Sequence, residues 1–326
     1  MLVLSDEDVR SAVPMDLAIE VNAAAFASME SGAAEVPERA IVSTKSGPTL
    51  FKPACIPSAA DPEAPEALGL KVVSVRAANA DMDLPTVPAT ILMFDATTGL
   101  PSAVVAATWL TALRTAAGSG VATRALAPAA PQRLVCFGAG MQAEAHISAM
   151  LCVRPSITSV AIVNRSLPRA ETLAATLSPT LSTEVLTLSD TAGVERVARA
   201  ADIVCATTNS STPMWDGAWL KPGAHINAIG SFTPQMQEVD AATMRRCRIV
   251  IDEPGAMTSS GDIAIPLAAG EISAETNGLR TLGSILLTAD GAEAAVSTQP
   301  VIQLRVIYTP ILALLVIMRS ILRGCL

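Results

Sequence analysis

The sequence is poor in aromatic residues, in histidine and in charge, and each shortage narrows the class of protein. Of its 326 residues, 51% are hydrophobic, only 3% are aromatic and 16% are charged, and there are two histidines. A chain this apolar is not disordered, and its core must be built from Ala, Val, Leu and Ile. The formal net charge of -8 offers no basic surface to a polyanion, so we predict no nucleic-acid partner.

Cysteines are few and scattered, and none forms a C-x-x-C pair. The six are Cys55, Cys136, Cys152, Cys205, Cys247 and Cys325. With only two histidines beside them, we expect no metal site. Scattered thiols in a chain of this length indicate a reducing compartment, so we predict a cytoplasmic protein.

Targeting and membrane signals are also lacking. The N-terminal stretch MLVLSDEDVRSAV has no basic region before an apolar run, so it does not read as a secretory signal. The one membrane-like run, Ile311 to Met318, is far shorter than the ~20 residues that a bilayer span needs. We therefore expect no membrane partner.

Hydrophobic periodicity divides the chain into two parts. Residues 1–32 have a helical pattern, with Ser5 as a cap, residues 36–106 have the period of strands joined by short turns, and 109–126 are helical again. After Pro128 and Pro131 helical stretches alternate with six strands, RLVCFG, SVAIVNR, EVLTLS, DIVCATT, AHINAIG and CRIVID. We predict an α/β protein with an α+β antiparallel-sheet domain over 1–127, which 295–326 complete in one alternative, and a Rossmann domain over 128–294.

The stretch LVCFGAGMQAEAHISAM, residues 134–150, carries a glycine loop between a strand and a helix. Gly138 and Gly140 occupy the first two positions of the G-x-G-x-x-G/A pattern, and Ala143 the third. The first glycine permits a tight turn, the second admits a pyrophosphate, and the helix N-terminus supplies free N–H groups. This pattern predicts a dinucleotide site that includes Met141 and Gln142.

The end of the next strand bears on the choice of cofactor. Asn164 stands where an NAD site has an acidic residue, and Arg165 follows it. Since a guanidinium binds phosphate bidentately, Arg165, with Ser166 and Arg169 nearby, favours NADP(H). NAD(H) stays open, because Arg165 also fits a solvated loop. Thr207, Thr208 and Ile229 follow later strands and are expected on the nicotinamide side.

Three cations in the first domain stand in apolar surroundings. Lys71 shares a strand face with Val73 and Val75, Arg114 lies inside a helix of small residues, and Arg39 opens the first long strand. Converging cations in a dry pocket bind a carboxylate. Each one alone could instead extend its charged end to solvent.

Several motifs resemble the ornithine cyclodeaminase/mu-crystallin family over about residues 1–275. They are TALRTAAGSGVATRAL, FGAGMQAEAH, VNRSLPRAETLA, WLKPGAHINAIGSFTPQMQEVD and SSGDIAIPLAAGEI. The resemblance implies homodimers that carry out hydride chemistry on amino and imino acids. It also implies that Arg39, Lys71 and Arg114 bind the substrate carboxylate, with Lys71 and Arg114 catalytic, and that Thr115 faces the cofactor.

One departure from the family concerns its catalytic aspartate. The cyclodeaminase loop reads Gly-Asp-x-Pro, whereas Phe232 takes the aspartate position here. Phenylalanine transfers no proton. The resemblance is therefore closest to the ketimine reductase type, which reduces Δ1-pyrroline-2-carboxylate or Δ1-piperideine-2-carboxylate to proline or pipecolate. A cyclodeaminase, an alanine- or opine-type dehydrogenase, and a non-catalytic NADPH-dependent binding protein are the alternatives.

The second departure is the tail, QPVIQLRVIYTPILALLVIMRSILRGCL, which lacks the family's usual strand turn and long returning helix. It fits either an interface helix with different residues or an altered gene end, so activity and dimer formation stay open. The two histidines are expected to be structural, with His146 near the cofactor and His225 at the start of a buried strand.

Overall fold

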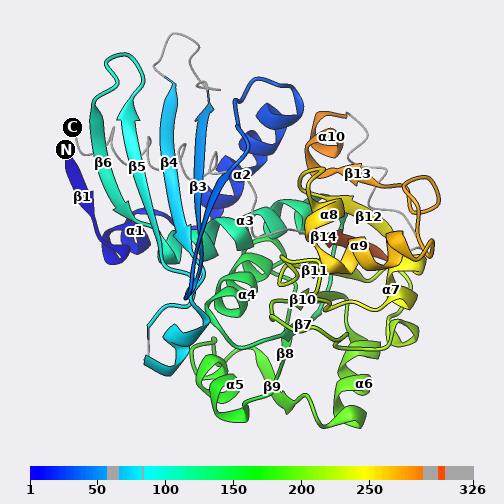
Figure 1. The fold of residues 1–326 in the computed structure, drawn as a ribbon. Helices are drawn as coiled ribbons and strands as arrows, with labels where there is room; N and C mark the ends of the chain where they lie inside the picture. The colour runs from blue at the N-terminus through cyan, green and yellow to red at the C-terminus, as the bar shows by residue number, and fades with distance from the viewer. Residues whose placement is uncertain (57–65, 83, 289–299, 305–326) are drawn as a thin grey trace. The chain divides into compact units, whose positions relative to one another are not determined.

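The structure is a computed structural model that describes residues 1–56, 66–82, 84–288 and 300–304 (Figure 1). The chain forms two compact units, which we call unit 1 and unit 2. The division falls inside helix α3 (Thr108–Leu126), between Arg114 and Thr115. The boundary expected from the sequence, 127/128, lies just after this helix instead.

Unit 1 contains a six-stranded sheet with the order β1-β6-β5-β4-β3-β2. Strands β2 to β6 form the predicted antiparallel meander, in which each strand pairs with the next one along the chain. The strands are β1 (Leu2–Leu4), β2 (Ala40–Thr44), β3 (Gly47–Ile56), β4 (Ala67–Ser74), β5 (Ala89–Asp95) and β6 (Pro101–Ala106).

The first residues of unit 1 differ from the prediction. Residues 2–4 were expected to be helical, but they form β1, which pairs in parallel with β6. The helix starts only after Ser5, whose side chain accepts from the Asp8 N–H while the Asp8 carboxylate accepts from the Ser5 N–H. This predicted cap begins α1 (Asp6–Ala12), and Pro14 precedes α2 (Met15–Glu30).

Unit 2 contains an eight-stranded sheet with the order β13-β12-β14-β11-β10-β7-β8-β9, and all of its pairs are parallel. The six strands predicted from the sequence are present. Its strands are β7 (Arg133–Phe137), β8 (Ser159–Asn164), β9 (Ser182–Thr187), β10 (Ile203–Ala206), β11 (His225–Ala228), β12 (Arg248–Ile251), β13 (Arg280–Thr281) and β14 (Val301–Leu304).

Strand β14 was not predicted. It lies between β11 and β12, with Val301 opposite both His225 and Arg248. The sequence analysis placed this stretch in a tail that in one alternative completes the first domain, whereas residues 301–304 extend the parallel sheet of unit 2. The rest of the tail, including the apolar run from Ile311, lies outside the described residues.

Helices connect the strands of unit 2, as the alternating pattern predicts. They are α4 (Met141–Val153), α5 (Leu167–Ala174), α6 (Thr191–Ala200), α7 (Ala241–Arg246), α8 (Ala256–Ser259), α9 (Gly261–Ala268) and α10 (Leu282–Leu287). The core is largely aliphatic, with one aromatic contact in which the rings of Phe137 and Trp215 lie 5.0 Å apart. Among the described residues, no helix combines the length and hydropathy of a membrane span.

Candidate functional site

The strand order of unit 2 reverses direction next to β7. The chain runs outward from β7 through β8 to β9, then returns to place β10 on the other side of β7. The connections that follow β7 and β10 therefore run in opposite directions along the sheet. In parallel sheets, ligands bind beside the carboxyl ends of two neighbouring strands that are arranged in this way. The predicted cofactor residues of this unit follow β8, β7, β10 and β11, which are neighbours in the sheet.

The glycine loop is shaped for a phosphate group. Gly138 has φ 112°, and a Cβ there would lie 2.6 Å from Thr207 Oγ1, so only glycine fits. Thr207 donates to the Phe137 carbonyl at 2.9 Å, which ties β10 to the loop. Gly140 is the N-cap of α4 without a side-chain cap, and the space where its Cβ would lie is open.

Two observations indicate that a dinucleotide fits this loop. The open space at Gly140 faces the first turn of a 13-residue helix, where N–H groups and the helix dipole attract anions. In that turn Gln142 Oε1 is buried and has no hydrogen-bond partner within the described part of the chain. Gly138, Gly140, Met141 and Gln142 would hold the pyrophosphate.

The predicted ribose-side residues lie together after β8. The Asn164 amide donates to the Ser166 carbonyl at 2.9 Å, and Ser166 is the N-cap of α5. Arg165 and Arg169 are both exposed, at the end of β8 and in the first turn of α5. Neither arginine is needed by the core of unit 2, so both are available to an anionic ligand.

A buried glutamate that the sequence analysis missed forms hydrogen bonds to residues at the ends of β10 and β11. Glu238 is fully buried, and its Oε1 accepts from the Thr208 N–H at 2.5 Å and from its hydroxyl at 2.6 Å. Its Oε2 accepts from the Gly230 N–H at 2.6 Å. Glu238 therefore links the end of β10 to the end of β11 by hydrogen bonds. Ile229, which follows β11, is also fully buried.

Asp262 forms a buried carboxyl pair with Glu238. Asp262 Oδ1 accepts from the backbone N–H groups of Glu238 and Val239, at 2.7 and 3.0 Å. Burial raises the pKa of Glu238 to about 7, although its N–H and O–H donors oppose that rise. Burial and the charge of Glu238 raise the pKa of Asp262 well above its usual range. Asp262 Oδ2 has no hydrogen-bond partner among the described residues.

The second half of α3 is fixed to unit 2 by polar contacts. Thr115 is fully buried at the start of this half. His146 Nε2 lies 3.2 Å from Ser119 Oγ, and its Nδ1 lies 2.7 Å from the Gln142 carbonyl. His146 thus links α3 to the glycine-loop helix, which agrees with the structural role expected for it.

The other histidine is also structural. His225 is fully buried, its Nε2 lies 3.2 Å from Asn227 Oδ1, and burial lowers its pKa to about 4. Asn227 also donates to Thr123 Oγ1 of α3 at 3.0 Å.

Unit 1 buries the predicted lysine and a second one that the sequence analysis missed. Alternate residues of β4 are buried, and Lys71 is among them at 1% exposure. Lys52 of β3 is directly opposite Lys71 in the register of the sheet and is 6% exposed. Arg39, half-buried, precedes Ala40, which pairs with Phe51, so Arg39 lies at the level of Lys52. Arg114, on α3, is fully buried in the same unit.

Phe232 lies in the loop after β11. It is half-buried and packs against the hydrophobic core of unit 2. A side chain held there by apolar contacts offers no proton to a ligand, as expected from its type.

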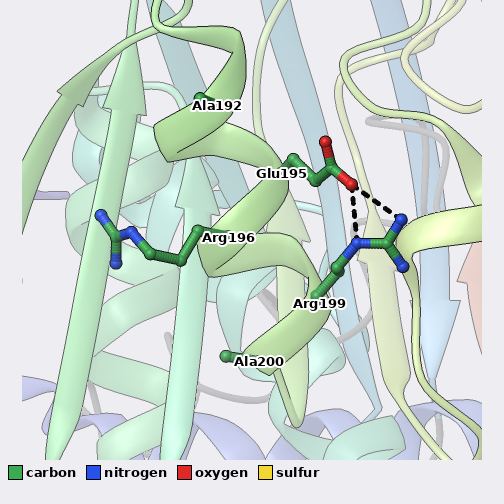
Figure 2. Close-up of a pocket in the computed structure, with 5 residues that line it drawn as sticks. All are labelled: Ala192, Glu195, Arg196, Arg199 and Ala200. Atoms are coloured by element: carbon green, nitrogen blue, oxygen red, sulfur yellow. Dashed lines mark hydrogen bonds and ion pairs between the residues drawn. The ribbon is translucent and has the colours of Figure 1, made fainter.

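A surface pocket of about 480 Å³ lies along α6 (Figure 2). Its lining comes from this one helix, including the ion pair between Glu195 and Arg199 at 2.7 Å. It contains none of the predicted site residues. Within the described residues, no group of three or more side chains is suited to hold a metal ion.

Comparisons with known proteins all indicate the same protein family. A family model described as the ornithine cyclodeaminase/mu-crystallin family matches residues 1–292. A Delta(1)-pyrroline-2-carboxylate reductase of Bacillus cereus is 31% identical over 274 residues, 83% of this chain and 81% of its own length. The ketimine reductase mu-crystallin of Mus musculus is 33% identical over 213 residues, 65% of each chain.

A solved structure is similar along nearly the whole chain. It is the Delta(1)-pyrroline-2-carboxylate reductase of Thermococcus litoralis, in complex with NADH and L-proline. It is 30% identical to this chain with a TM-score of 0.85, and the match covers 99% of this chain and 98% of that one.

Proposed function

The chain belongs to the ornithine cyclodeaminase/mu-crystallin family, and from this premise we propose that it reduces cyclic imino acids with NAD(P)H. The substrates are Δ1-pyrroline-2-carboxylate and Δ1-piperideine-2-carboxylate, and the products are proline and pipecolate. Relatives named for this activity, one solved with NADH and L-proline, support the assignment. The protein is an enzyme that acts on C=N bonds with a nicotinamide cofactor.

The observation that carries the choice within the family is Phe232. A cyclodeaminase needs an acid/base where this half-buried phenylalanine stands. Reduction of a protonated imine has no such requirement, because the nitrogen already carries its proton. When bound, the cofactor supplies the hydride that the imine carbon accepts.

The residues of unit 1 bind and orient the substrate in this proposal. Lys71, Arg39 and Arg114 hold its carboxylate, and the charges of the buried Lys71 and Arg114 favour the anionic acid over neutral imines. Lys71, or water, supplies the proton that the imine nitrogen carries. Thr115, Thr207, Thr208 and Ile229 contact the nicotinamide half of the cofactor.

We also propose a preference for NADP(H) over NAD(H), based on the exposed Arg165 and Arg169 beside a neutral Asn164. The enzyme acts as a homodimer, as the family resemblance implies. A cytoplasmic location agrees with Cys55, Cys136, Cys205 and Cys247, which are free thiols.

The test is oxidation of NADPH by the wild-type protein with each cyclic imine, next to an assay for ammonia release from ornithine with NAD⁺. We expect NADPH oxidation that depends on the imine, with proline or pipecolate as product, and no ammonia from ornithine. Ammonia release without imine reduction would overturn the proposal in favour of a cyclodeaminase. Tight NADPH binding without turnover would favour the non-catalytic binding protein.

A further inference from the structure

Glu238 is a buried acid directly behind a residue that the proposed function assigns to the nicotinamide. Its Oε1 accepts from both the N–H and the hydroxyl group of Thr208, at 2.5 and 2.6 Å. Thr208 is half-buried, whereas Glu238 is fully buried. Glu238 therefore has no exposed surface for a cofactor to touch, and it acts on a cofactor only through its neighbours or through its charge.

The carboxyl group of Glu238 is fixed between the ends of two neighbouring strands. Its Oε2 accepts from the N–H of Gly230, which follows β11, at 2.6 Å. A Cβ at Gly230 would collide with the Thr208 carbonyl oxygen and would lie 2.6 Å from Glu238 Oε2, so the strand ends approach closely here. Because ligands of such sheets lie beside the carboxyl ends of the strands, a charge on Glu238 would act on that part of the ligand.

The titratable groups that face Glu238 within the described part of the chain are Asp262 of α9 and Cys136 of β7. Asp262 accepts from the backbone N–H of Glu238, and burial together with the charge of Glu238 raises the pKa of Asp262 well above its usual range. Burial raises the pKa of the Cys136 thiol to about 12, so this thiol stays neutral. Burial also raises the pKa of Glu238 to about 7, and its carboxyl group therefore changes charge near neutral pH.

The two oxidation states of nicotinamide differ in charge, since the reduced ring is neutral and the oxidised ring is a cation. A buried carboxylate acts strongly on a nearby cation, because the protein interior screens charges less than water does. We propose that Glu238 is a positioning residue whose ionised form favours the oxidised cofactor and whose neutral form favours the reduced one. This inference rests on the proposed reductase function and adds to it a regulation by pH.

The charge of Glu238 thus affects the two ends of the catalytic cycle in opposite ways. Below the pKa of Glu238 the neutral carboxyl group favours retention of the reduced cofactor and release of the oxidised one, which suits imine reduction. Above this pKa the carboxylate retains the oxidised cofactor, so inhibition by that product becomes stronger. The reaction itself is unchanged, because Glu238 exchanges a proton with water and not with the substrate.

The experiment measures the Kd of NADPH by fluorescence titration and that of NADP⁺ by competition, without any imine, from about pH 5.5 to about pH 8.5. The 2′-phosphate, with a second pKa of about 6, is common to both forms, so its effect cancels in the ratio of the two Kd values. NADH and NAD⁺, which lack this phosphate, provide a repeat. Wild type is compared with Glu238→Gln, with Asp262→Asn, and with Glu275→Gln as the exposed control.

We expect the ratio of the Kd of NADP⁺ to that of NADPH to fall about tenfold as pH rises, the scale of one charge acting through the protein interior. Glu238→Gln should keep the ratio at its low-pH value. Asp262→Asn, which retains the Glu238 carboxyl group, should keep the fall, as should Glu275→Gln. A wild-type ratio that does not change with pH, or a fall that Glu238→Gln leaves intact, would overturn the proposal.

The binding measurement separates this inference from the proposed function. Since no imine is present, a fall of the ratio that depends on Glu238 would support the inference even if the protein reduced neither cyclic imine. Conversely, imine reduction together with a constant ratio would overturn the inference and leave the reductase function intact. The wild-type measurement requires no substitution, so the test does not depend on the folding of a variant.

Discussion

The two units bury charges of opposite sign and use them differently. In unit 2, the carboxyl groups of Glu238 and Asp262 accept from backbone N–H groups of Thr208, Gly230, Glu238 and Val239. In unit 1, Lys52 and Lys71 lie side by side on an apolar sheet face. This contrast agrees with the proposed roles, in which the buried acids of unit 2 hold the ends of β10 and β11 in place and the buried cations of unit 1 bind an anionic substrate.

The largest effect is expected when a cation of unit 1 is removed. Lys71→Met should lower kcat/KM for the cyclic imine by about 100-fold, because loss of one partner of a buried ion pair costs about 2–5 kcal/mol. The affinity for NADPH should stay unchanged. Steady-state kinetics and NADPH fluorescence titration measure the two quantities.

Lys45→Met is the matched control for this substitution, since it removes an exposed lysine of the same sheet. If Lys71→Met weakened NADPH binding as much as it lowered turnover, the division of roles between the units would be wrong.

A smaller effect is expected from the glycine loop. Gly138→Ala should weaken NADPH binding and lower the free energy of unfolding by about 2–4 kcal/mol, because a side chain strains a positive φ and meets Thr207. Gly223→Ala is the control, since Gly223 has φ 75° but open space around it. It should lose about 1 kcal/mol of stability from strain alone and keep its cofactor affinity. Equal NADPH affinities in the two variants would contradict the role of Gly138.

The buried acids of unit 2 should appear in the pH dependence of stability. Burial raises the pKa of Glu238 from its usual 4.5 to about 7, so the folded protein binds this proton more tightly than the unfolded chain. The stabilisation is complete below pH ~4.5 and is lost as pH rises through ~7, by about 3 kcal/mol.

Glu238→Gln should remove the part of this decline that Glu238 causes and leave the part from Asp262, whose pKa burial also raises. Denaturant unfolding at several pH values measures it. Comparison of the variant with wild type also separates Glu238 from His225, whose lowered pKa acts in the opposite direction. Glu275→Gln, at an exposed position, should keep the wild-type profile. A pH dependence that Glu238→Gln left intact would show that Glu238 is ionised throughout.

The smallest effect concerns cofactor choice. Arg165→Ala combined with Arg169→Ala should raise the Kd of NADPH by about tenfold and that of NADH little, since an exposed arginine–phosphate pair contributes about 1 kcal/mol. Arg196→Ala on α6 is the control for loss of an exposed arginine. Equal losses of affinity for NADPH and NADH would show that these arginines do not contact the 2′-phosphate.

Local steric and periodic patterns made much of the fold predictable. The turn at Gly138 and the alternation of strands and helices are short-range properties, so the glycine loop and six strands of unit 2 follow from the sequence. Strand β14 depends on a distant segment that inserts between β11 and β12, and no local pattern specifies such an insertion. Strand β1 has three residues, too few to show a period.

The missed site residues have the same physical explanation. Lys52 belongs to no motif, and only the β3–β4 register shows that it is buried opposite Lys71. Glu238 and Asp262 are far apart in sequence, and their pairing requires the folded loops. Two signals were available: a lysine on the apolar face of a strand, and acidic residues within the two motifs that resemble the family.

Transfer of deuterium from NADPH labelled at the nicotinamide C4 position tests the central claim most directly. Δ1-Pyrroline-2-carboxylate and its piperideine homologue are incubated with wild-type protein and NADPH labelled on either face, and the amino acid products are examined by mass spectrometry. We expect deuterium at the ring carbon that bears the carboxylate, and only when the label is on one particular face of the nicotinamide. Absence of labelled proline or pipecolate, despite saturation with the cofactor, would contradict it.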